Sequence, residues 1–561
     1  MSNQSEVILI FPPQFPPFQP HLALPSLNAS LRLNGVGGRA LDLNVEFYHY
    51  CLSPDLVREA VLQLEGQVAS GKEAPIDILG YLSTSEIVLS ELTFSVRRLS
   101  GLEPAGIPEL LRAQKVANRA LQLVSRSYGF RLSLQELTLE NPRATQGYAS
   151  LLRRFMESGP AKVLRRAGPA VVGMSIATHQ QRVGSQVLAN CIREILPSVN
   201  IVVGGSIPTL YSSVPAVRWY FRSWADQIFV GESEETLVRY SQEVLGKATC
   251  RSVRTSDTDR LIHPDVSPDI SALPTPSYEG LPLNKYLSPR AVLPLTTARG
   301  CAWRRCTFCS HSYVYGSGYR ARPLDAVASD IKELLLLNPG TYLSLYDEFI
   351  PLTRLRALAD IIGNWETGWS AYTRFNGNWS KATVKALSHS GCRLLSFGLE
   401  SGSDRVLADM DKGIDRKMIL RGLDALDGSS IWTHLYLILG FPTESSRDFE
   451  QTLELVNIYK NRTVSFGPSG FGLAPGSEIA GRPGRYDIVN IHVPDDPFSG
   501  VPFQTSNGIN PQTIRERVGL VWSALGERWW QRLEFVQVLH LLPLCQHDCN
   551  LVGPIAIEMK S

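Results

Sequence analysis

The sequence predicts an α/β protein with two parallel sheets: a doubly wound, Rossmann-like sheet followed by a partial (β/α)6 barrel of the TIM type. The first observation is a strand–helix–strand series at the start of the chain, and the second is a run of six β/α units in its second half. The third is length, because 561 residues are too many for one hydrophobic core. A hydrophobic fraction of 44% and a charged fraction of 19% are typical of a globular protein.

Composition argues against several classes of function. The formal net charge is +2, from 55 Lys and Arg against 53 Asp and Glu, which gives no reason to expect nucleic acid or a membrane surface as a partner. We find no apolar run of transmembrane length and no start of the signal-peptide type. Nine cysteines, an odd number and mostly scattered, do not suggest a disulfide framework. We therefore expect a cytoplasmic protein.

The first domain is expected at residues 1–250. Residues 6–12 are apolar without alternation, as in a buried parallel strand, and a Pro-rich loop follows them. Residues 24–33 carry apolar side chains at helical spacing and end at Asn34-Gly35, a normal signal for a helix C-terminus. A second strand is expected at 39–45.

From residue 52 to 163 the pattern changes to long helical periodicity, which we interpret as a helical insertion. Such an insertion either covers a site or only adds packing. The sheet then resumes, with a helix spanning 187–196 and with strands expected at 170–175, 200–206 and 227–232.

Glycines stand at the ends of two of these strands, namely Gly204-Gly205 and Gly231. Glycine at the carboxyl edge of a doubly wound sheet permits close approach of the backbone to a ligand. The alternative is that they are ordinary turn glycines.

Residues 251–290 are rich in Ser, Thr, Asp and Pro and are expected to form a linker. The barrel is expected at 291–480, and residues 481–561 form a C-terminal extension with a helix near 510–533. Helices between the barrel strands include 324–337, 353–362 and 448–459. The strands themselves are expected at 291–297, 341–346, 369–374, 393–398, 432–439 and 463–468. In such a barrel the chemistry lies in loops at the carboxyl ends of the strands.

Cys301, Cys306 and Cys309 lie just after the first barrel strand at the spacing C-x4-C-x2-C. Thiolates at this density select zinc, copper(I) or iron–sulfur chemistry. An iron–sulfur cluster normally takes four protein thiolates, so three would leave one iron open to a further ligand. The competing interpretation is a structural Cys3His zinc site completed by His311.

A second group, Cys545-Gln-His547-Asp-Cys549, lies near the end of the sequence. It is either a further metal group or an irregular tail with incidental cysteines, and no fourth ligand type stands nearby.

Four further motifs surround the cysteine loop, and with them the barrel resembles the radical S-adenosylmethionine (SAM) superfamily, in particular the members with an N-terminal cobalamin-binding domain. Thr296 to Cys301 and Tyr319 to Pro323 flank the loop on its two sides. The other matching stretches are Phe397 to Ser403 with Met410 to Gly413, and Leu439 to Glu444. One feature departs from the superfamily, whose commonest spacing is C-x3-C-x2-C.

The resemblance implies that Cys301, Cys306 and Cys309 bind a [4Fe–4S] cluster whose open iron is chelated by SAM. Phe308 would lie against the adenine, or else be a core aromatic. Glu400, with Gly398 and Ser401 in the same motif, would contact SAM; the alternative for Glu400 is a carboxylate at a helix N-terminus. The stretch that would lie near the adenine is Gly440, Pro442 and Glu444.

Two further positions of the barrel are candidates with an open alternative. Arg374, at the end of the third strand, would pair with the SAM carboxylate because a guanidinium suits bidentate recognition; otherwise it is a surface arginine. Asp347 and Glu348, after the second strand, are a paired carboxylate that would face the substrate as catalytic residues, or else cap a helix.

The first domain resembles cobalamin-binding domains in its strand order and in Asp42, Asn44, the stretch Ser175 to Gln180, Gly204-Gly205 and Gly231-Glu232. The signature D-x-H-x-x-G for a histidine ligand of cobalt is absent, because His179 has Ala177 where the aspartate should be. That absence either leaves cobalt accessible from below, which suits methyl transfer from SAM, or reflects a domain that has lost cobalamin.

The resemblance therefore implies a [4Fe–4S] enzyme that cleaves SAM to a 5′-deoxyadenosyl radical. With cobalamin it would C-methylate a natural product or a modified peptide, using one SAM as methyl donor and a second as radical source. An external one-electron donor of the flavodoxin or ferredoxin type is expected. The alternatives are a radical rearrangement or oxidation without methylation, and a non-catalytic zinc-binding protein.

Overall fold

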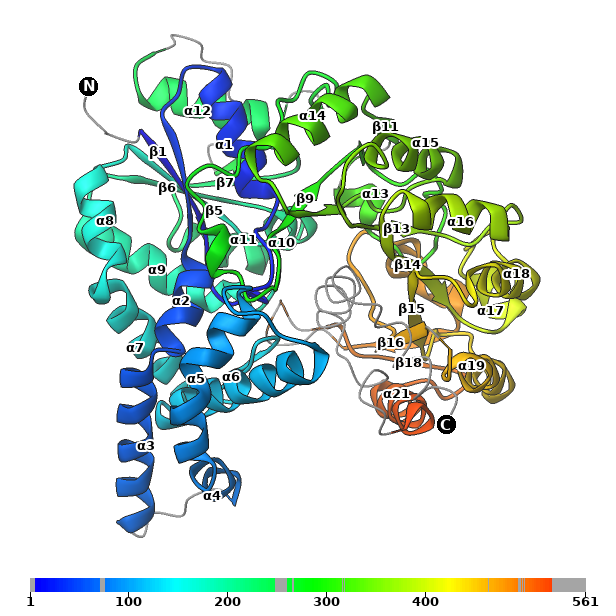
Figure 1. The fold of residues 1–561 in the computed structure, drawn as a ribbon, viewed down its shortest axis with the longest axis horizontal. Helices are drawn as coiled ribbons and strands as arrows, with labels where there is room; N and C mark the ends of the chain where they lie inside the picture. Colours follow the sequence, from blue (N-terminus) through cyan, green and yellow to red (C-terminus); the bar gives the residue numbers. More distant parts are fainter. Residues whose placement is uncertain are drawn as a thin grey trace. The chain divides into compact units, whose positions relative to one another are not determined.

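The computed structural model describes residues 6–70, 76–247, 260–264, 267–314, 316, 318–462, 464–492, 496, 498 and 500–526 (Figure 1). The chain divides into two compact units, one formed by 1–269 with 273–292 and the other by 270–272 with 293–561. Among the described residues, no helix has the length and apolar character that crossing a membrane requires.

The first unit is built on a six-stranded parallel sheet, which confirms the doubly wound prediction. The strand order is β2-β1-β5-β6-β7-β8, so the order reverses at β1 and β5, where doubly wound sheets bind ligands. The strands are β1 Val7–Phe11, β2 Gly38–Asp42, β5 Val171–Ser175, β6 Asn200–Gly204, β7 Gln227–Phe229 and β8 Leu261–Ile262. The two-residue β8 lies inside the predicted linker and is too short to show in a sequence pattern.

The second strand was predicted to continue to residue 45, and this was wrong. β2 ends at Asp42, and helix α2 (Leu43–Cys51) begins directly after it. Asp42 stops the strand because its carboxylate caps the helix, accepting a hydrogen bond from the Val45 amide at 2.9 Å. Its other oxygen accepts from the Tyr286 hydroxyl at 2.6 Å, and burial raises the pKa of Asp42 to about 6.

Helices surround this sheet. α1 (Ala23–Leu33) and α9 (Gln181–Ile195) confirm predicted helices, and α1 packs against α12 (Glu234–Val244). The insertion is helical as predicted, apart from the short hairpin of β3 (Arg131–Leu132) and β4 (Leu137–Thr138). The other helices are α3 Pro54–Ala69, α4 Ile76–Leu82, α5 Ser85–Leu99, α6 Ile107–Ser127, α7 Pro142–Ser158, α8 Pro160–Ala167, α10 Ser206–Leu210, α11 Pro215–Arg222 and the 3-10 turn η1 Leu283–Lys285.

The second unit contains a six-stranded sheet in sequential order, as a partial barrel requires. Every predicted barrel strand is confirmed to within two residues. The strands are β9 Val292–Leu295, β12 Tyr342–Leu345, β13 Trp369–Thr373, β14 Cys392–Glu400, β15 Trp432–Leu439 and β16 Val464–Gly470. The helices are α13 His311–Val314, α14 Leu324–Leu337, α15 Leu352–Ile362, α16 Lys381–His389, α17 Asp404–Asp409, α18 Arg416–Leu426 and α19 Ser446–Tyr459.

The segment after the barrel is part of the core of this unit. It forms α20 (Glu478–Gly481), the 3-10 turn η2 (Pro483–Tyr486), and the antiparallel pair β17 (Ile488–Ile491) and β18 (Phe503–Thr505). Helix α21 (Pro511–Leu525) confirms the start of the helix predicted near 510–533 and ends before Gly526, whose φ of 77° is left-handed. Residues 527–533 of that prediction lie outside the described residues. Cys545, His547 and Cys549 lie outside the described residues.

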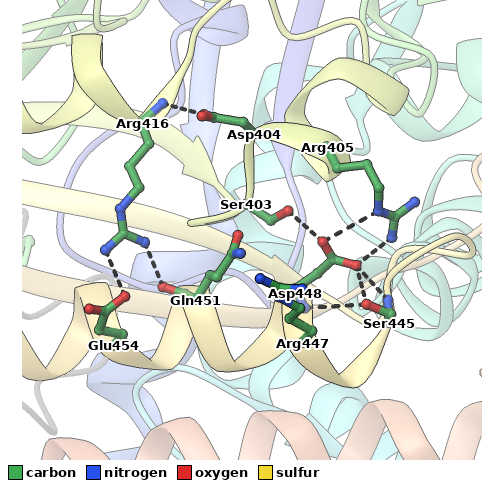
Figure 2. A pocket seen from close by; sticks show the side chains of 9 residues that line it. All are labelled: Ser403, Asp404, Arg405, Arg416, Ser445, Arg447, Asp448, Gln451 and Glu454. Carbon is green, nitrogen blue, oxygen red and sulfur yellow. Dashed lines mark hydrogen bonds and ion pairs between the residues drawn. The ribbon is translucent and has the colours of Figure 1, made fainter.

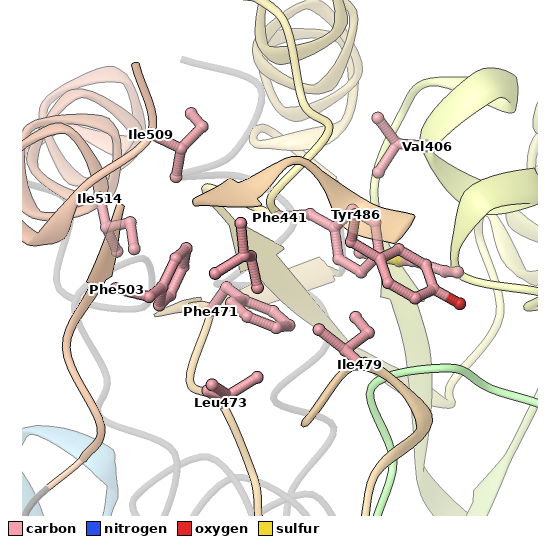
Figure 3. Close-up of a cluster of buried hydrophobic side chains, with 11 residues drawn as sticks. Val406, Phe441, Phe471, Leu473, Ile479, Tyr486, Phe503, Ile509 and Ile514 are labelled. Atoms are coloured by element: carbon pink, nitrogen blue, oxygen red, sulfur yellow. The ribbon is translucent and has the colours of Figure 1, made fainter. Parts of the chain in front are cut away.

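A cluster of buried apolar side chains joins this segment to the barrel (Figure 3). Phe441, after β15, has ring contacts with Phe471 at 5.4 Å and Tyr486 at 6.3 Å between centroids. The cluster, named here the C-terminal core, consists of Val406, Met410, Phe441, Phe471, Leu473, Ile479, Tyr486, Ile488, Phe503, Ile509 and Ile514. Its members are spaced singly among Pro and Gly, so the sequence shows no regular apolar pattern there.

Replacing Phe503 should show that the C-terminal core stabilises the barrel unit. Phe503 is 2% exposed, so Phe503→Ala should lower the free energy of unfolding by about 3–5 kcal/mol through lost burial and the cavity left behind. Val489, on the paired strand, is 68% exposed, and Val489→Ala should change the free energy of unfolding by about 0.5 kcal/mol or less. Urea unfolding measures both, and equal effects of the two variants would contradict a packed core.

Candidate functional site

The cysteine loop leaves β9 through a short antiparallel ribbon, in which β10 (Ala298–Arg299) pairs with β11 (Arg320–Ala321). Gly300 begins the loop with a φ of 76°, and a Cβ there would lie 2.1 Å from the Gly318 carbonyl oxygen, so only glycine fits. Cys301, Cys306 and Cys309 are free thiols and partly exposed. The loop therefore presents its cysteines at the carboxyl end of the first barrel strand, as predicted.

Trp303 anchors the loop on the turn formed by residues 410–413. Its indole N–H donates to the Asp411 carbonyl at 2.6 Å, and a Cβ on Gly413 would lie 2.0 Å from the indole ring. The Thr307 amide also donates to the Met410 carbonyl, at 3.0 Å. Between this tryptophan and Cys306, Arg304 adopts a left-handed φ of 54°.

A buried ion pair lies beside this turn. Lys412 Nζ is 2.7 Å from Glu400 Oε1 and 5.8 Å from the centre of the Phe308 ring. Glu400 has a φ of 65°, rare for a residue with a side chain, at a bulge that breaks the β14–β15 register after Gly398. A Cβ on Gly398 would lie 2.4 Å from Glu400 Oε1, so the missing side chain makes room for the pair.

Ser401 and Phe308 have different surroundings, one in a hydrogen-bonded loop and the other against apolar side chains. The Ser401 hydroxyl lies 3.2 Å from the Thr452 hydroxyl and accepts from the Ser403 amide at 3.2 Å, so it fixes the loop after β14. Phe308 is partly buried and packs against the C-terminal core with its ring below Lys412.

Glu444 stabilises the backbone turn after β15. Its Oε2 accepts from the Gly440 amide at 2.8 Å and from the guanidinium of Arg517 on α21. Burial raises the pKa of Glu444, although Arg517 opposes the change. Asn507 donates to the Pro442 carbonyl at 3.0 Å. Sequence reasoning missed Arg517 and Asn507, because nothing in the local pattern links them to a turn some 65 or more residues earlier.

Asp347 and Glu348 point to different partners. Asp347 accepts from the amide and the hydroxyl of Thr297, both at 2.6 Å, and so ties the end of β12 to the start of the cysteine loop. Burial raises the pKa of Asp347 to about 6, while the bonds from Thr297 oppose the rise. Glu348 Oε2 instead lies 2.7 Å from His311 Nδ1.

The pairing of His311 with Glu348 bears on the zinc alternative, which needs His311 as its fourth ligand. Among the described residues, no group of three or more His, Cys, Asp or Glu side chains is arranged to hold a single metal ion. In this structure His311 therefore faces Glu348.

Arg374 lies between the cysteine loop and the neighbouring strand ends. Its guanidinium carbon is 4.5 Å from the centre of the Trp303 ring and 5.6 Å from that of Phe349, and it donates to the Lys412 carbonyl. Burial lowers the pKa of Arg374, and the nearby Cys306 and Cys301 oppose that change. It is therefore a half-buried cation beside the thiols rather than a surface arginine.

A charged network supports the loop after β14 from outside (Figure 2). Asp448 accepts from the Ser403 hydroxyl at 2.6 Å and from Arg405, and Ser445 and Asp448 form a capping box at the start of α19. Burial alone would raise the pKa of Asp448, but Arg405, Ser403 and Ser445 hold it well below its usual range. A pocket of about 580 Å³ lies among these side chains.

The carboxyl edge of the first unit's sheet carries the remaining predicted residues. Gly205 has a φ of 108°, and a Cβ there would lie 2.5 Å from the Ile176 carbonyl oxygen. Gly231 has a φ of 83° and donates to the Thr209 hydroxyl at 2.9 Å. Both glycines are thus required by the backbone, and Gly204 ends β6 beside Ser175 of β5.

Gln181 connects the loops at this edge, and sequence reasoning did not single it out. Its Oε1 accepts from the Ala177 and Thr178 amides at 2.8 and 3.1 Å, and its Nε2 donates to the Pro12 carbonyl at 2.7 Å. His179 Nε2 lies 3.3 Å from the Tyr211 hydroxyl. The Ser175 hydroxyl is buried and has no hydrogen-bond partner among the described residues, so it is available to a ligand at the edge.

The cysteine loop brings three free thiols together beside two cations. Burial raises the pKa of Cys306 and raises that of Cys309 to about 12, which favours the neutral thiols in the metal-free protein, so a bound metal would be needed to keep them ionised as ligands. Lys412 and Arg374 favour the Cys306 thiolate. Three thiolates from one loop beside two cations suit a [4Fe–4S] cluster with one open iron.

Residues 295–456 match the model of the radical SAM superfamily. An uncharacterised methyltransferase of Pyrococcus horikoshii is 24% identical over 312 residues, which cover 52% of this chain and 65% of that protein. The bacteriochlorophyllide d C-12(1)-methyltransferase of Chlorobaculum tepidum is 23% identical over 262 residues, which cover 46% of this chain and 54% of that protein. The chain thus spans less than two thirds of the length of either relative.

Two solved structures share the fold. The cobalamin- and [4Fe–4S]-bound radical SAM methyltransferase TsrM of Kitasatospora setae has a TM-score of 0.54 at 14% identity and covers 85% of this chain and 77% of its own. The cobalamin-dependent radical SAM enzyme OxsB has a TM-score of 0.51 at 16% identity, with 68% and 63% covered. The doubly wound sheet and the partial barrel therefore occur together in solved proteins.

Filling the space under Trp303 should disturb the cysteine loop. Gly413→Ala would push a methyl group against the indole ring and would also place alanine in a left-handed backbone conformation. The clash should lower the free energy of unfolding by about 1–3 kcal/mol, in addition to about 1–2 kcal/mol for the backbone conformation. Gly428→Ala is the matched control, because Gly428 has a φ of 73° with no atom near its would-be Cβ. After reconstitution, iron per chain should fall in Gly413→Ala and not in Gly428→Ala; equal iron in both would refute the seating of Trp303.

Asp347 should make stability depend on pH in a defined direction. Its folded-state pKa of about 6 exceeds its ordinary value of 3.8, so the folded state holds the proton more tightly and stability falls as pH rises through that window. Between pH 4.5 and 7, metal-free wild type should lose about 2 kcal/mol relative to Asp347→Asn. The exposed Asp360→Asn serves as control, and parallel pH profiles for wild type and Asp347→Asn would rule the shift out.

Proposed function

We propose that this chain, which carries a radical SAM domain in its barrel, is a cobalamin-dependent radical SAM enzyme that C-methylates a small-molecule or peptide substrate. The observation that carries the proposal is the placement of three free cysteines on one loop at the carboxyl end of β9, next to the Glu400–Lys412 pair. When bound, a [4Fe–4S] cluster with SAM supplies a 5′-deoxyadenosyl radical, which removes hydrogen from an unactivated C–H bond.

The barrel residues take distinct roles in this proposal. Cys301, Cys306 and Cys309 would hold the cluster, and the half-buried Arg374 would receive the SAM carboxylate. Phe308 would offer its ring to the adenine. Because both oxygens of Asp347 bind Thr297, we assign it to positioning the loop, and leave Glu348 with His311 as the pair that could exchange a proton with substrate.

The first unit would hold cobalamin at the carboxyl edge of its sheet. The buried Ser175 hydroxyl lacks a partner among the described residues, and Gly205 and Gly231 keep the backbone of the edge free of side chains. His179 lies beside Tyr211 and would act as a polar wall residue. These features fit a large planar cofactor without requiring a histidine ligand to its metal.

The remaining parts of the proposal concern partners. The reaction needs electrons from outside, and we propose a flavodoxin- or ferredoxin-type donor, which places the protein in the cytoplasm. Support for methylation as the outcome comes from the methyltransferases that the chain resembles in sequence and fold.

Reconstituted protein should produce 5′-deoxyadenosine and S-adenosylhomocysteine when given SAM, hydroxocobalamin and a strong reductant, because SAM must then methylate the reduced cobalamin. A Cys301/Cys306/Cys309→Ala variant should lose 5′-deoxyadenosine by about 100-fold or more, because no cluster forms. Cys191→Ala removes a free cysteine of α9 and should keep the activity. Chromatography of the nucleosides is the measurement. Undiminished 5′-deoxyadenosine from the triple variant would refute the proposal, and 5′-deoxyadenosine without S-adenosylhomocysteine would replace methylation by a rearrangement or oxidation.

A further inference from the structure

A second pocket of the barrel unit, of about 420 Å³, lies at the carboxyl ends of β12 and β13, the edge where barrels carry their chemistry. It is formed by the loop between β12 and α15, by the first turns of α15, and by the loop after β13. The side chains that define it are Phe349, Thr353, Arg356, Arg374, Asn376 and Asn378. We call it the β12–β13 pocket.

The charge of this pocket is not neutralised. Two of its lining residues are arginines and none is an aspartate or glutamate. Arg356 donates to the Thr383 hydroxyl and Arg374 to the Lys412 carbonyl, and neither guanidinium forms an ion pair with a carboxylate of the described residues. Each guanidinium has five N–H donors, so most remain available.

The pocket in Figure 2, in the same unit, is an example of a pocket in which arginines are paired with carboxylates. Two of its three arginines form ion pairs with carboxylates: Arg405 with Asp448, and Arg416 with Glu454 at 2.8 Å. The charges of these arginines are thus paired within that pocket. The β12–β13 pocket lacks such partners, so its two positive charges favour an anion from outside the chain.

Helix α15 adds to this preference. Its first residues, Leu352 and Thr353, line the pocket, and its N-cap residue Pro351 makes no side-chain cap. The first amides of an uncapped helix are hydrogen-bond donors at the positive end of the helix dipole. Asn376 and Asn378 also line the space, and their side-chain amides can act as further donors.

We propose that the β12–β13 pocket binds a carboxylate or phosphate group of the substrate. Arginine recognises both groups with two parallel hydrogen bonds, and a helix N-terminus favours either. Arg374 reaches from this pocket to Trp303 of the cysteine loop, at 4.5 Å, so an anchored substrate would lie next to the reacting centre. The assignment of this anion to the substrate rests on the proposed function. The binding of an oxyanion in the pocket is independent of it.

SAM also carries a carboxylate, and Arg374 is our candidate for it, so Arg356 is the diagnostic residue. Arg356 lies on the exposed side of α15 and has no other role in the proposed chemistry. If the pocket received the carboxylate of SAM, SAM alone would protect Arg356, and decarboxylated SAM would not.

The test is the rate at which phenylglyoxal modifies individual arginines of the reconstituted protein, followed by peptide mass spectrometry. Inorganic phosphate, and separately acetate, should slow modification of Arg356 and Arg374 about tenfold, as expected when charge-assisted hydrogen bonds cover a guanidinium. The exposed Arg304 of the cysteine loop should react at an unchanged rate. Equal rates at Arg356 with and without these anions would overturn the proposal.

Calorimetric titration with phosphate gives an independent readout. Arg356→Gln should weaken phosphate binding about tenfold. Arg356→Lys should weaken it less, because lysine keeps the positive charge but cannot donate two parallel hydrogen bonds. The exposed Arg515→Gln of α21 is the matched control and should bind like wild type. Protection of Arg356 by SAM but not by decarboxylated SAM would assign the pocket to SAM and overturn the substrate assignment. Phosphate binding in a protein that never cleaves SAM would refute the proposed function alone.

Discussion

The buried ion pair between Glu400 and Lys412 is the interaction on which the site depends. It joins the end of β14 to the turn that seats the cysteine loop, across 2.7 Å. A buried pair of this kind is costly to desolvate, and losing one partner typically costs about 3–5 kcal/mol because the other charge stays buried. The chain also places Glu400 in a left-handed conformation, a strain that the surrounding structure must offset and that usually marks a functional position. Gly398 leaves room for the pair, and Gly413, next to Lys412, leaves room for Trp303.

The strands and loops around this pair could be predicted from the sequence in part. The barrel strands were found to within two residues because short segments rich in apolar residues alternate with stretches of helical periodicity. The cysteine loop was found from its spacing and its place after β9. The second strand was extended too far, because nothing in an apolar pattern reveals that Asp42 will cap a helix rather than continue the ladder. Pairing of the two-residue β8 depends on contacts that only the folded sheet provides.

The roles of individual site residues were harder to predict than their location. Glu444 belongs to a motif near the end of β15, but its partner Arg517 comes from α21, and the C-terminal core that brings them together is built from singly spaced apolar residues. Asp347 and Glu348 are adjacent in sequence and were predicted as one pair, yet they bind different partners, Thr297 and His311 respectively. Motif matching locates such residues, whereas long-range contacts decide what each one does.

Charge balance links these observations to the chemistry proposed. Burial disfavours ionised thiols at Cys306 and Cys309, while Lys412 and Arg374 favour the thiolate of Cys306. Lys412 is itself balanced by Glu400, so its effect on the thiols is reduced; Arg374 has no carboxylate partner among the described residues and stays a net positive charge. A cluster held by three thiolates and the carboxylate of SAM would balance part of that charge, and Arg356 would share with Arg374 in binding an anion in the β12–β13 pocket. The same arginine thus makes the loop receptive to a metal cluster and the neighbouring pocket receptive to an anion, which would hold both at the same edge of the barrel.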